Sequence, residues 1–159
     1  MVEADAPFIV ELFNDPEWLR LIGDRGIRSA DEAQAYIRTG PQDMYSRLGF
    51  GLWVAELKSS GAPIGICGLL KREALADVDL GYALLPAHRR QGFAREAAAA
   101  TVTFASSSLG LRRLAAIVSP ENAPSVRLLD DLGFRFERSI RLAPTSKEVN
   151  LFSSELASP

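Results

Sequence analysis

The sequence has few of the residues that build metal sites and disulfides. Its 159 residues include one histidine, His88, and one cysteine, Cys67. One cysteine cannot form an internal disulfide, and one histidine with one cysteine does not supply the ligands of a typical zinc site. We therefore expect no metal, and we interpret Cys67, which lies among apolar residues, as an inert thiol of the core or of a crevice wall.

Long apolar runs and an excess of positive charge are also missing. No stretch approaches the ~20 apolar residues that a membrane-spanning helix needs. Glu3 and Asp5 stand where a signal peptide carries basic residues. The formal net charge is −2 and the pI is about 5.5, whereas nucleic-acid binding usually leaves a basic footprint. We therefore predict a cytoplasmic protein with neither a membrane nor a nucleic-acid partner.

The rest of the composition is that of one ordinary globular domain. The chain is 47% hydrophobic and 24% charged, which is close to the average for such domains. Its 159 residues can bury a sizeable core but are few for two domains. We therefore predict a single domain over residues 1–159.

Hydrophobic periodicity and capping residues divide the chain into a helical first third and an alternating remainder. Ser29 and Glu32 form a capping box, and Asn122 is the expected N-cap of a later helix. Helices are predicted over residues 6–13, 30–39, 91–107 and 123–132, with shorter helical pieces over 17–22 and 43–48, and strands over 50–57, 64–70, 78–84, 113–118, 134–140 and 149–153. The tail from residue 155 is expected to fray.

Connection lengths predict how the strands pair. The first three strands are joined by short turns and should be antiparallel. A helical crossover separates strand 78–84 from strand 113–118, so these two should be parallel. Gly81, inside strand 78–84, suggests either a β-bulge or a close approach of the backbone.

The central feature is a strand, a basic turn and a helix that follow one another over residues 79–100. Arg89, Arg90 and Arg95 surround Gly92 in and after the turn. The first N–H groups of a helix lack intrahelical partners and the helix dipole favours an anion there, so a diphosphate is the expected ligand. The G-x-x-x-x-G-K-[ST] and G-x-G-x-x-G patterns are absent. A solvated arginine cluster stays open as the alternative.

Three motifs, in order, resemble the GNAT acyltransferases. The residues Arg89-x-x-Gly92-x-Ala94 are similar to the family's R/Q-x-x-G-x-G/A signature, and strand 79–86 resembles the strand that pairs with pantetheine. The segment that starts at Asn122-x-x-Ser125 and ends at residue 134 resembles the second signature. The resemblance covers about residues 53–152 and points most to the branch of ribosomal-protein N-terminal acetyltransferases.

The resemblance implies a fold and an activity. The fold is α/β (α+β), with a mixed, mostly antiparallel sheet of six to seven strands, splayed at the coenzyme A crevice and flanked by about four helices. The activity is acetyl transfer from acetyl-CoA to a primary amine of a small molecule or protein N-terminus, by direct attack in a ternary complex. The alternatives are a non-catalytic acyl-CoA-binding or regulatory domain and a binder of other phosphorylated ligands. The oligomeric state stays open, with a homodimer as one alternative.

The resemblance also implies which residues hold the cofactor and do the chemistry. The expected coenzyme A ligands are Tyr82, Ala83, Leu84, Arg89, Arg90, Gln91, Gly92, Phe93, Ala94, Asn122 and Ser125. A base must neutralise the amine, and Asp79, on the strand that lines the crevice, is the first candidate. The loop carboxylates Glu73, Asp77 and Glu121 are weaker ones. Backbone N–H groups near Ala83 and Leu84 are expected to stabilise the oxyanion.

Two features depart from the family pattern. Only five residues precede the first helix, where family members carry a strand, so either this strand is missing or the recorded start lies too far downstream. Leu129 occupies the position of the family's general-acid tyrosine. Ser125 or a water is then the candidate acid, although a thiol with a pKa of ~8.5 also leaves without help.

A few conspicuous side chains carry no firm functional prediction. His88 stands beside the basic turn and is interpreted as a loop residue next to the ligand. Trp18, Tyr36 and Trp53 either line the acceptor side of the crevice or pack in the core.

Overall fold

The computed structural model describes residues 1–156, and a six-stranded sheet forms its centre. In this part of the chain the strands lie in the order β1-β2-β3-β4-β6-β5, and β3–β4 is the one parallel pair. They are β1 (Leu52–Glu56), β2 (Pro63–Leu70), β3 (Val78–Leu84), β4 (Arg113–Val118), β5 (Arg135–Arg141) and β6 (Glu148–Glu155). The predicted mixed, mostly antiparallel sheet is confirmed.

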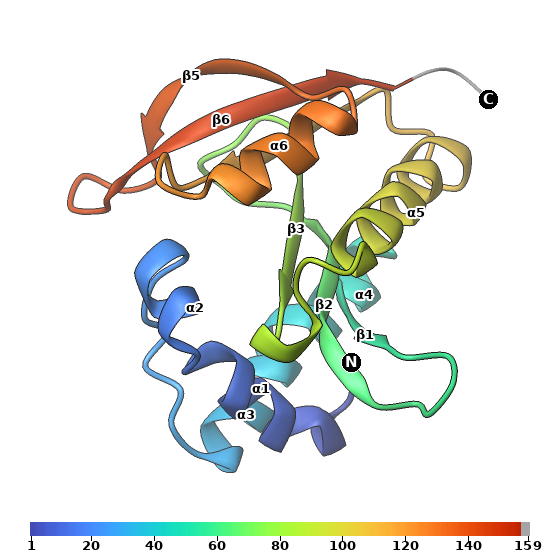
Figure 1. Cartoon of the computed structure of the whole chain (residues 1–159), viewed down its shortest axis with the longest axis vertical. Helices are drawn as coiled ribbons and strands as arrows, with labels where there is room; N and C mark the ends of the chain where they lie inside the picture. The colour runs from blue at the N-terminus through green and yellow to red at the C-terminus, as the bar shows by residue number, and fades with distance from the viewer. Residues whose placement is uncertain (157–159) are drawn as a thin grey trace.

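Six α-helices surround the sheet within residues 1–156. They are α1 (Ala6–Phe13), α2 (Pro16–Leu21), α3 (Ala30–Ile37), α4 (Asp43–Leu48), α5 (Phe93–Ser107) and α6 (Ala123–Asp131). α2 and α4 have six residues each, which explains why the number exceeds the expected four. Figure 1 shows α1, α2 and α3 gathered at one end of the molecule and α6, β5 and β6 at the other.

The two ends of the described chain differ in how they relate to the sheet. Within the described residues no strand precedes α1, and β1 is an edge strand, as the short N-terminal segment predicts. β6 still pairs at Glu155, where the tail is expected to fray, and residues 157–159 of that tail lie outside the described residues. In the described part of the chain, no helix has both the length and the apolar character needed to cross a bilayer.

Local capping explains where two helices begin. Ser29 Oγ accepts the Glu32 N–H at 3.3 Å, and Glu32 Oε2 accepts the Ser29 N–H at 2.9 Å, which confirms the capping box. Asn122 Oδ1 accepts the Ser125 N–H at 3.2 Å and caps α6 as predicted. The helix that was expected to stop at Gly40 is α3, and it ends at Ile37. A π-helical turn (Arg38–Gln42) that contains a proline follows it and leads directly into α4.

The sheet is covered on both faces because apolar side chains alternate along its strands. Leu52 and Ile66 point to one face and belong to the core formed with α1 and α3. Cys67 and Leu69 point to the other face and belong to the core under α5 and α6. Burial of these side chains, worth about 1.5–3 kcal/mol for each large one, holds the helices against the strands.

β3 and β4 separate soon after they meet. Their pairing covers only Val78↔Leu114 and Asp79↔Ala115, although β4 pairs with β6 over its whole length. Beyond Asp79, the edge of β3 that faces β4 has no strand beside it within the described residues. The predicted splay is therefore confirmed, and it opens at the carboxyl ends of two parallel strands, where ligand crevices form in such sheets.

The β-bulge considered for Gly81 is wrong. β2 and β3 pair without a register shift from Gly65↔Leu84 to Leu70↔Asp79. The glycine instead permits a close approach, because a Cβ at this position would lie 2.7 Å from Leu70 Cδ1. This neighbour is the end of a side chain, so the close backbone approach, the second alternative for this residue, stays a prediction.

Gly68→Ala tests the close packing of β1 on β2. A Cβ at Gly68 would lie 2.1 Å from the carbonyl oxygen of Gly51 and 2.9 Å from Leu52 Cα, and both are backbone atoms. We expect the substitution to lower the free energy of unfolding by about 3 kcal/mol, as measured by urea denaturation. Gly40→Ala is the control, because its Cβ would make an ordinary 3.5 Å contact with Tyr36. Equal effects of the two substitutions would contradict this packing.

Candidate active site

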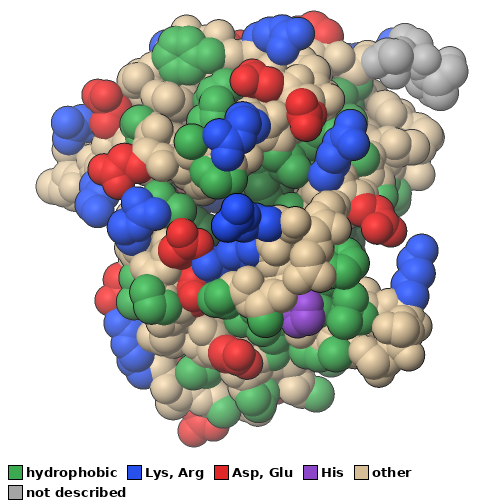
Figure 2. Space-filling model, viewed as in Figure 1, with side chains coloured by type: hydrophobic (Ala, Val, Ile, Leu, Met, Phe, Trp, Pro, Cys, Tyr) green, Lys and Arg blue, Asp and Glu red, His purple; other side chains and the backbone are tan. Residues whose placement is uncertain are grey.

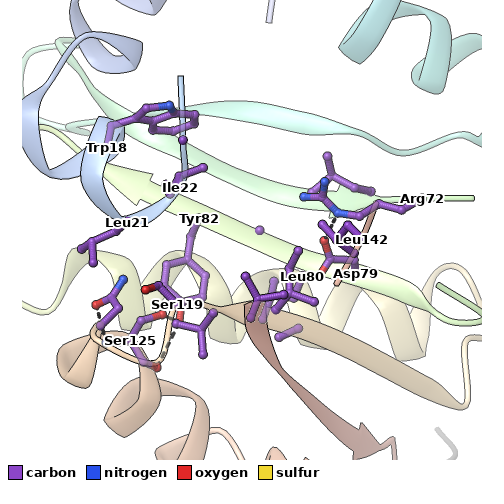
Figure 3. Close-up of a pocket in the computed structure, with 18 of the residues that line it drawn as sticks. Trp18, Leu21, Ile22, Arg72, Asp79, Leu80, Tyr82, Ser119, Ser125 and Leu142 are labelled. Carbon is purple, nitrogen blue, oxygen red and sulfur yellow. Dashed lines mark hydrogen bonds and ion pairs between the residues drawn. The ribbon is translucent and has the colours of Figure 1, made fainter. Parts of the chain in front are cut away.

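Two adjoining cavities occupy the splay between β3 and β4. The inner cavity has a volume of about 420 Å³ and the outer cavity one of about 560 Å³. Both are lined by Trp18, Leu21, Ile22, Tyr82, Asn122 and Ser125. Figure 3 shows the inner cavity with Asp79 and Arg72 at one end and Ser125 at the other. The crevice is therefore elongated, with chemically different ends.

The outer cavity ends at the basic turn. Arg90 and Gly92 adopt left-handed conformations, with φ of 61° and 88°, and α5 begins at the next residue without a side-chain cap. A Cβ at Gly92 would meet nothing within 4 Å, so the glycine leaves open space beside the helix N-terminus. Such a terminus presents free N–H groups to an anion. The backbone here therefore suits a diphosphate.

Three arginines add positive charge to the same cavity. Arg90, Arg95 and Arg127 line it, and none of them forms an ion pair or hydrogen bond within the described residues. Figure 2 shows Lys and Arg side chains gathered near the middle of this face. These guanidinium groups are available to an anionic ligand, since no carboxylate of the described chain neutralises them.

Arg89 differs from its neighbours because its donors are already used. Its Nη2 lies 2.5 Å from Asp15 Oδ2, its Nη1 contacts Glu17, and its Nε donates to the Leu84 carbonyl at 2.9 Å. Asp15 also caps α2, where its Oδ2 accepts the Trp18 N–H at 3.1 Å. Arg89 thus attaches the basic turn to α2 and to the end of β3.

The remaining turn residues divide between the cavity and its surroundings. Ala94 lines the outer cavity, whereas Gln91 and Phe93 do not. Gln91 Nε2 donates to the Ala87 carbonyl at 2.8 Å, and the Phe93 ring lies 6.4 Å from that of His88. His88 lines neither cavity, so it is a loop residue beside the turn.

The edge of β3 offers free backbone donors to the crevice. The Leu85 N–H donates to the Ile64 carbonyl of the β2 side at 2.8 Å. Because N–H groups alternate along an antiparallel strand, the Ala83 N–H also points to β2, whereas those of Tyr82 and Leu84 point to the side without a partner strand. All three residues line the outer cavity. Tyr82 and Leu84, rather than Ala83, therefore supply the free N–H groups.

A hydroxyl pair stands where the two cavities meet. Tyr82 Oη lies 2.7 Å from Ser125 Oγ, and Asn122 holds the first turn of the same helix α6. Burial raises the pKa of Tyr82 to about 12, so the phenol keeps its proton at neutral pH. Leu129, at the position of the family's tyrosine, is buried. The sequence pattern missed this pair because β3 and α6 meet only in the folded chain.

Asp79 lies at the closed end of the inner cavity. It is 1% exposed, and its Oδ2 accepts a hydrogen bond from Arg72 Nε at 2.6 Å. Its Oδ1 makes no hydrogen bond of standard geometry within residues 1–156, although the Ile117 N–H also acts on this carboxyl. Burial raises the pKa of Asp79 to about 6, against the opposing effects of Arg72 and of the Ile117 N–H. A buried carboxyl with a raised pKa in a cleft is typical of a functional site.

None of the three weaker candidate bases lines the inner cavity. Asp77 pairs with Arg113 at 3.2 Å, and Glu121, which lines the outer cavity, pairs with Arg20 at 3.2 Å. Glu73 lines neither cavity.

Four further side chains are placed by the folded structure. Trp18 lines both cavities, whereas Trp53 packs edge-on against Phe104 away from them. Tyr36 packs edge-on against Phe13 in the core with α1 and α3. Cys67 Sγ lies 3.4 Å from a threonine hydroxyl, and burial raises the pKa of its thiol to about 11.

Comparison with solved structures identifies the fold. The ribosomal-protein-S5-alanine acetyltransferase of Vibrio fischeri superposes with a TM-score of 0.80 at 18% identity, over 98% of this chain and 90% of that one. The spermidine N-acetyltransferase of Vibrio cholerae, solved with CoA and spermine, gives a TM-score of 0.79 at 19% identity, over 98% and 92% of the two chains. At these identities the likeness shows a shared fold.

Sequence comparison extends the likeness to the family. An uncharacterised N-acetyltransferase of Bacillus subtilis, YoaA, is 31% identical over 143 residues, which make up 89% of this chain and 80% of that protein. The sequence pattern of the acetyltransferase (GNAT) domain matches residues 1–135. The chain therefore belongs to the GNAT family and is an acetyltransferase that uses acetyl-CoA.

Proposed function

We propose that this enzyme acetylates a primary amine held in the inner cavity, by direct attack on acetyl-CoA in a ternary complex. The observation that carries this proposal is the junction of two cavities at Tyr82 and Ser125. One cavity suits an anionic, extended donor, and the other is closed by a buried carboxyl. The Vibrio cholerae spermidine N-acetyltransferase, solved with CoA and spermine, is consistent with two such subsites.

The outer cavity fits the donor. Acetyl-CoA supplies an acetyl group activated as a thioester. Arg90 and Arg95, with the first N–H groups of α5, bind its diphosphate, and the open space at Gly92 admits it. The N–H groups of Tyr82 and Leu84 bind an extended ligand as an added strand would be bound.

Protons are handled at the two ends of the inner cavity. The amine nitrogen forms a bond to the acetyl carbon as the C–S bond breaks, so the amine loses a proton and the thiolate gains one. Tyr82, with Ser125, holds the proton that the thiolate takes up. Asp79 accepts the proton of the amine. Its Cα lies about 10 Å along β3 from that of Tyr82, so the amine lies between acid and base, with a water completing the path.

Gly92→Val tests the donor site. A branched side chain would occupy the space that the diphosphate needs, so CoA should no longer raise the melting temperature, and thiol release from acetyl-CoA should stop. Gly110→Val is the matched control, because Gly110 also has a left-handed φ and open space but follows the C-terminal end of α5 and lines neither cavity. Unchanged CoA binding by Gly92→Val would contradict the assignment. Binding without turnover of any amine would favour a non-catalytic protein.

Tyr82→Phe tests the acid. We expect kcat to fall about tenfold, less than the 10²–10⁴-fold typical of general acids, because a thiol leaves readily. The CoA-induced rise in melting temperature should persist. Tyr45→Phe is the control, since its hydroxyl donates to the Leu52 carbonyl and lines neither cavity. Equal rates for the two variants would exclude Tyr82 as the proton donor.

Asp79→Asn tests the buried carboxyl through stability. Because the native pKa of about 6 lies above the unfolded value of 3.8, ionisation of Asp79 lowers the stability of the wild type as the pH rises through this range. Asparagine stays neutral, so the variant should gain about 3 kcal/mol relative to the wild type between pH 4 and pH 7. Urea denaturation at several pH values measures this difference. A constant difference would show that Arg72 fully offsets the burial.

The same variant tests the base. Asp79→Asn should lower turnover most below the pKa of the amine and leave CoA binding intact. Asp77→Asn is the control, because its carboxylate pairs with Arg113 and lines neither cavity.

A further inference from the structure

The inner cavity is lined mainly by apolar side chains. They come from α2 and the loop after it, from β2 and β3, from β4, and from the hairpin of β5 and β6. Examples are Trp18, Ile22, Leu70, Leu80, Leu142 and Val149. An acceptor that fills this space therefore has an apolar body, because apolar surface gains about 25 cal/mol per Å² when it leaves water.

Two aspartates and two arginines line this cavity, and they differ in their partners. Asp79 is matched by Arg72, at 2.6 Å, and Asp24 is matched by Arg28, also at 2.6 Å. Arg25 lines the cavity as well, and it forms no ion pair or hydrogen bond within residues 1–156. Arg25 is therefore the lining guanidinium that can bind a ligand without breaking an ion pair of the described chain.

Tyr36 shows where this charge lies. Burial raises the pKa of Tyr36, and the positive charges of both Arg25 and Arg72 act in the opposite direction. Both guanidinium groups therefore lie near this ring. Arg72 is bound to Asp79 in the interior, whereas Arg25 is exposed and lines the same cavity where it meets solvent.

We infer that the acceptor is a primary amine with an apolar body and a carboxylate, such as an apolar amino acid or a short apolar peptide. Arg25 binds the carboxylate, since a guanidinium group donates two parallel hydrogen bonds to such a group. The amine itself lies toward Tyr82, and its proton reaches Asp79 through the intervening water. A polyamine is disfavoured, because an additional positive charge would meet the unpaired Arg25. This inference rests on the proposed acetyl transfer.

The test compares acceptors that differ in charge at one end. Leucine and leucyl-leucine are compared with their C-terminal amides, and spermidine serves as the polycation. Thiol release from acetyl-CoA gives kcat/KM, and isothermal titration in the presence of CoA gives the affinity of each acceptor. We expect the free acids to exceed their amides at least tenfold in both measurements, and spermidine to be the poorest acceptor.

Arg25→Gln tests the contribution of this arginine. The ratio of kcat/KM for the acid to that for its amide should fall to about one, because KM for the acid rises while kcat stays the same. Arg138→Gln, on the exposed strand β5, is the control and should keep the preference. A preference for the amides or for spermidine, a preference for acids that survives in Arg25→Gln, or binding of no acid would overturn the inference. Acid-selective binding without thiol release would support the site and contradict acetyl transfer.

Discussion

The short parallel contact between β3 and β4 is the constraint on which the rest of the structure depends. Two residue pairs join the strands, at Val78 and Asp79 of β3, and then the sheet opens. β3 stays with β2 and β4 stays with β6, so the two halves diverge as intact units. Continued pairing would have consumed the N–H groups of Tyr82 and Leu84 and closed both cavities. The crevice therefore exists because the pairing of β3 with β4 ends after two residue pairs.

Ion pairs around the opening divide the arginines into two kinds. Arg89 bonds to Asp15, Glu17 and the end of β3, and so holds the basic turn in the conformation that exposes the start of α5. Arg90 and Arg95 have no such partners in the described chain and face the outer cavity. A turn held by one arginine leaves its neighbours free for an anion at little conformational cost.

The inner cavity keeps a carboxyl group where burial opposes its charge. Arg72 offsets part of the cost, yet the pKa of Asp79 is still raised to about 6. An apolar residue at this position would stabilise the fold more, since a buried ion pair is seldom better than apolar packing. The apolar walls, the raised pKa of Asp79 and the unpaired Arg25 are the features on which the proposed acceptor rests.

The sequence by itself determined the local features: the capping residues Ser29 and Asn122, the alternating strands, and the Gly92 turn ahead of α5. These depend on residues a few positions apart, so the periodicity and caps were sufficient to predict most elements, and three short motifs carried the resemblance to the family. Only the tertiary structure decided that Arg89 meets Asp15, 74 residues away, and that Tyr82 meets Ser125, 43 residues away. Such contacts depend on how far β3 and β4 diverge, which no local pattern specifies.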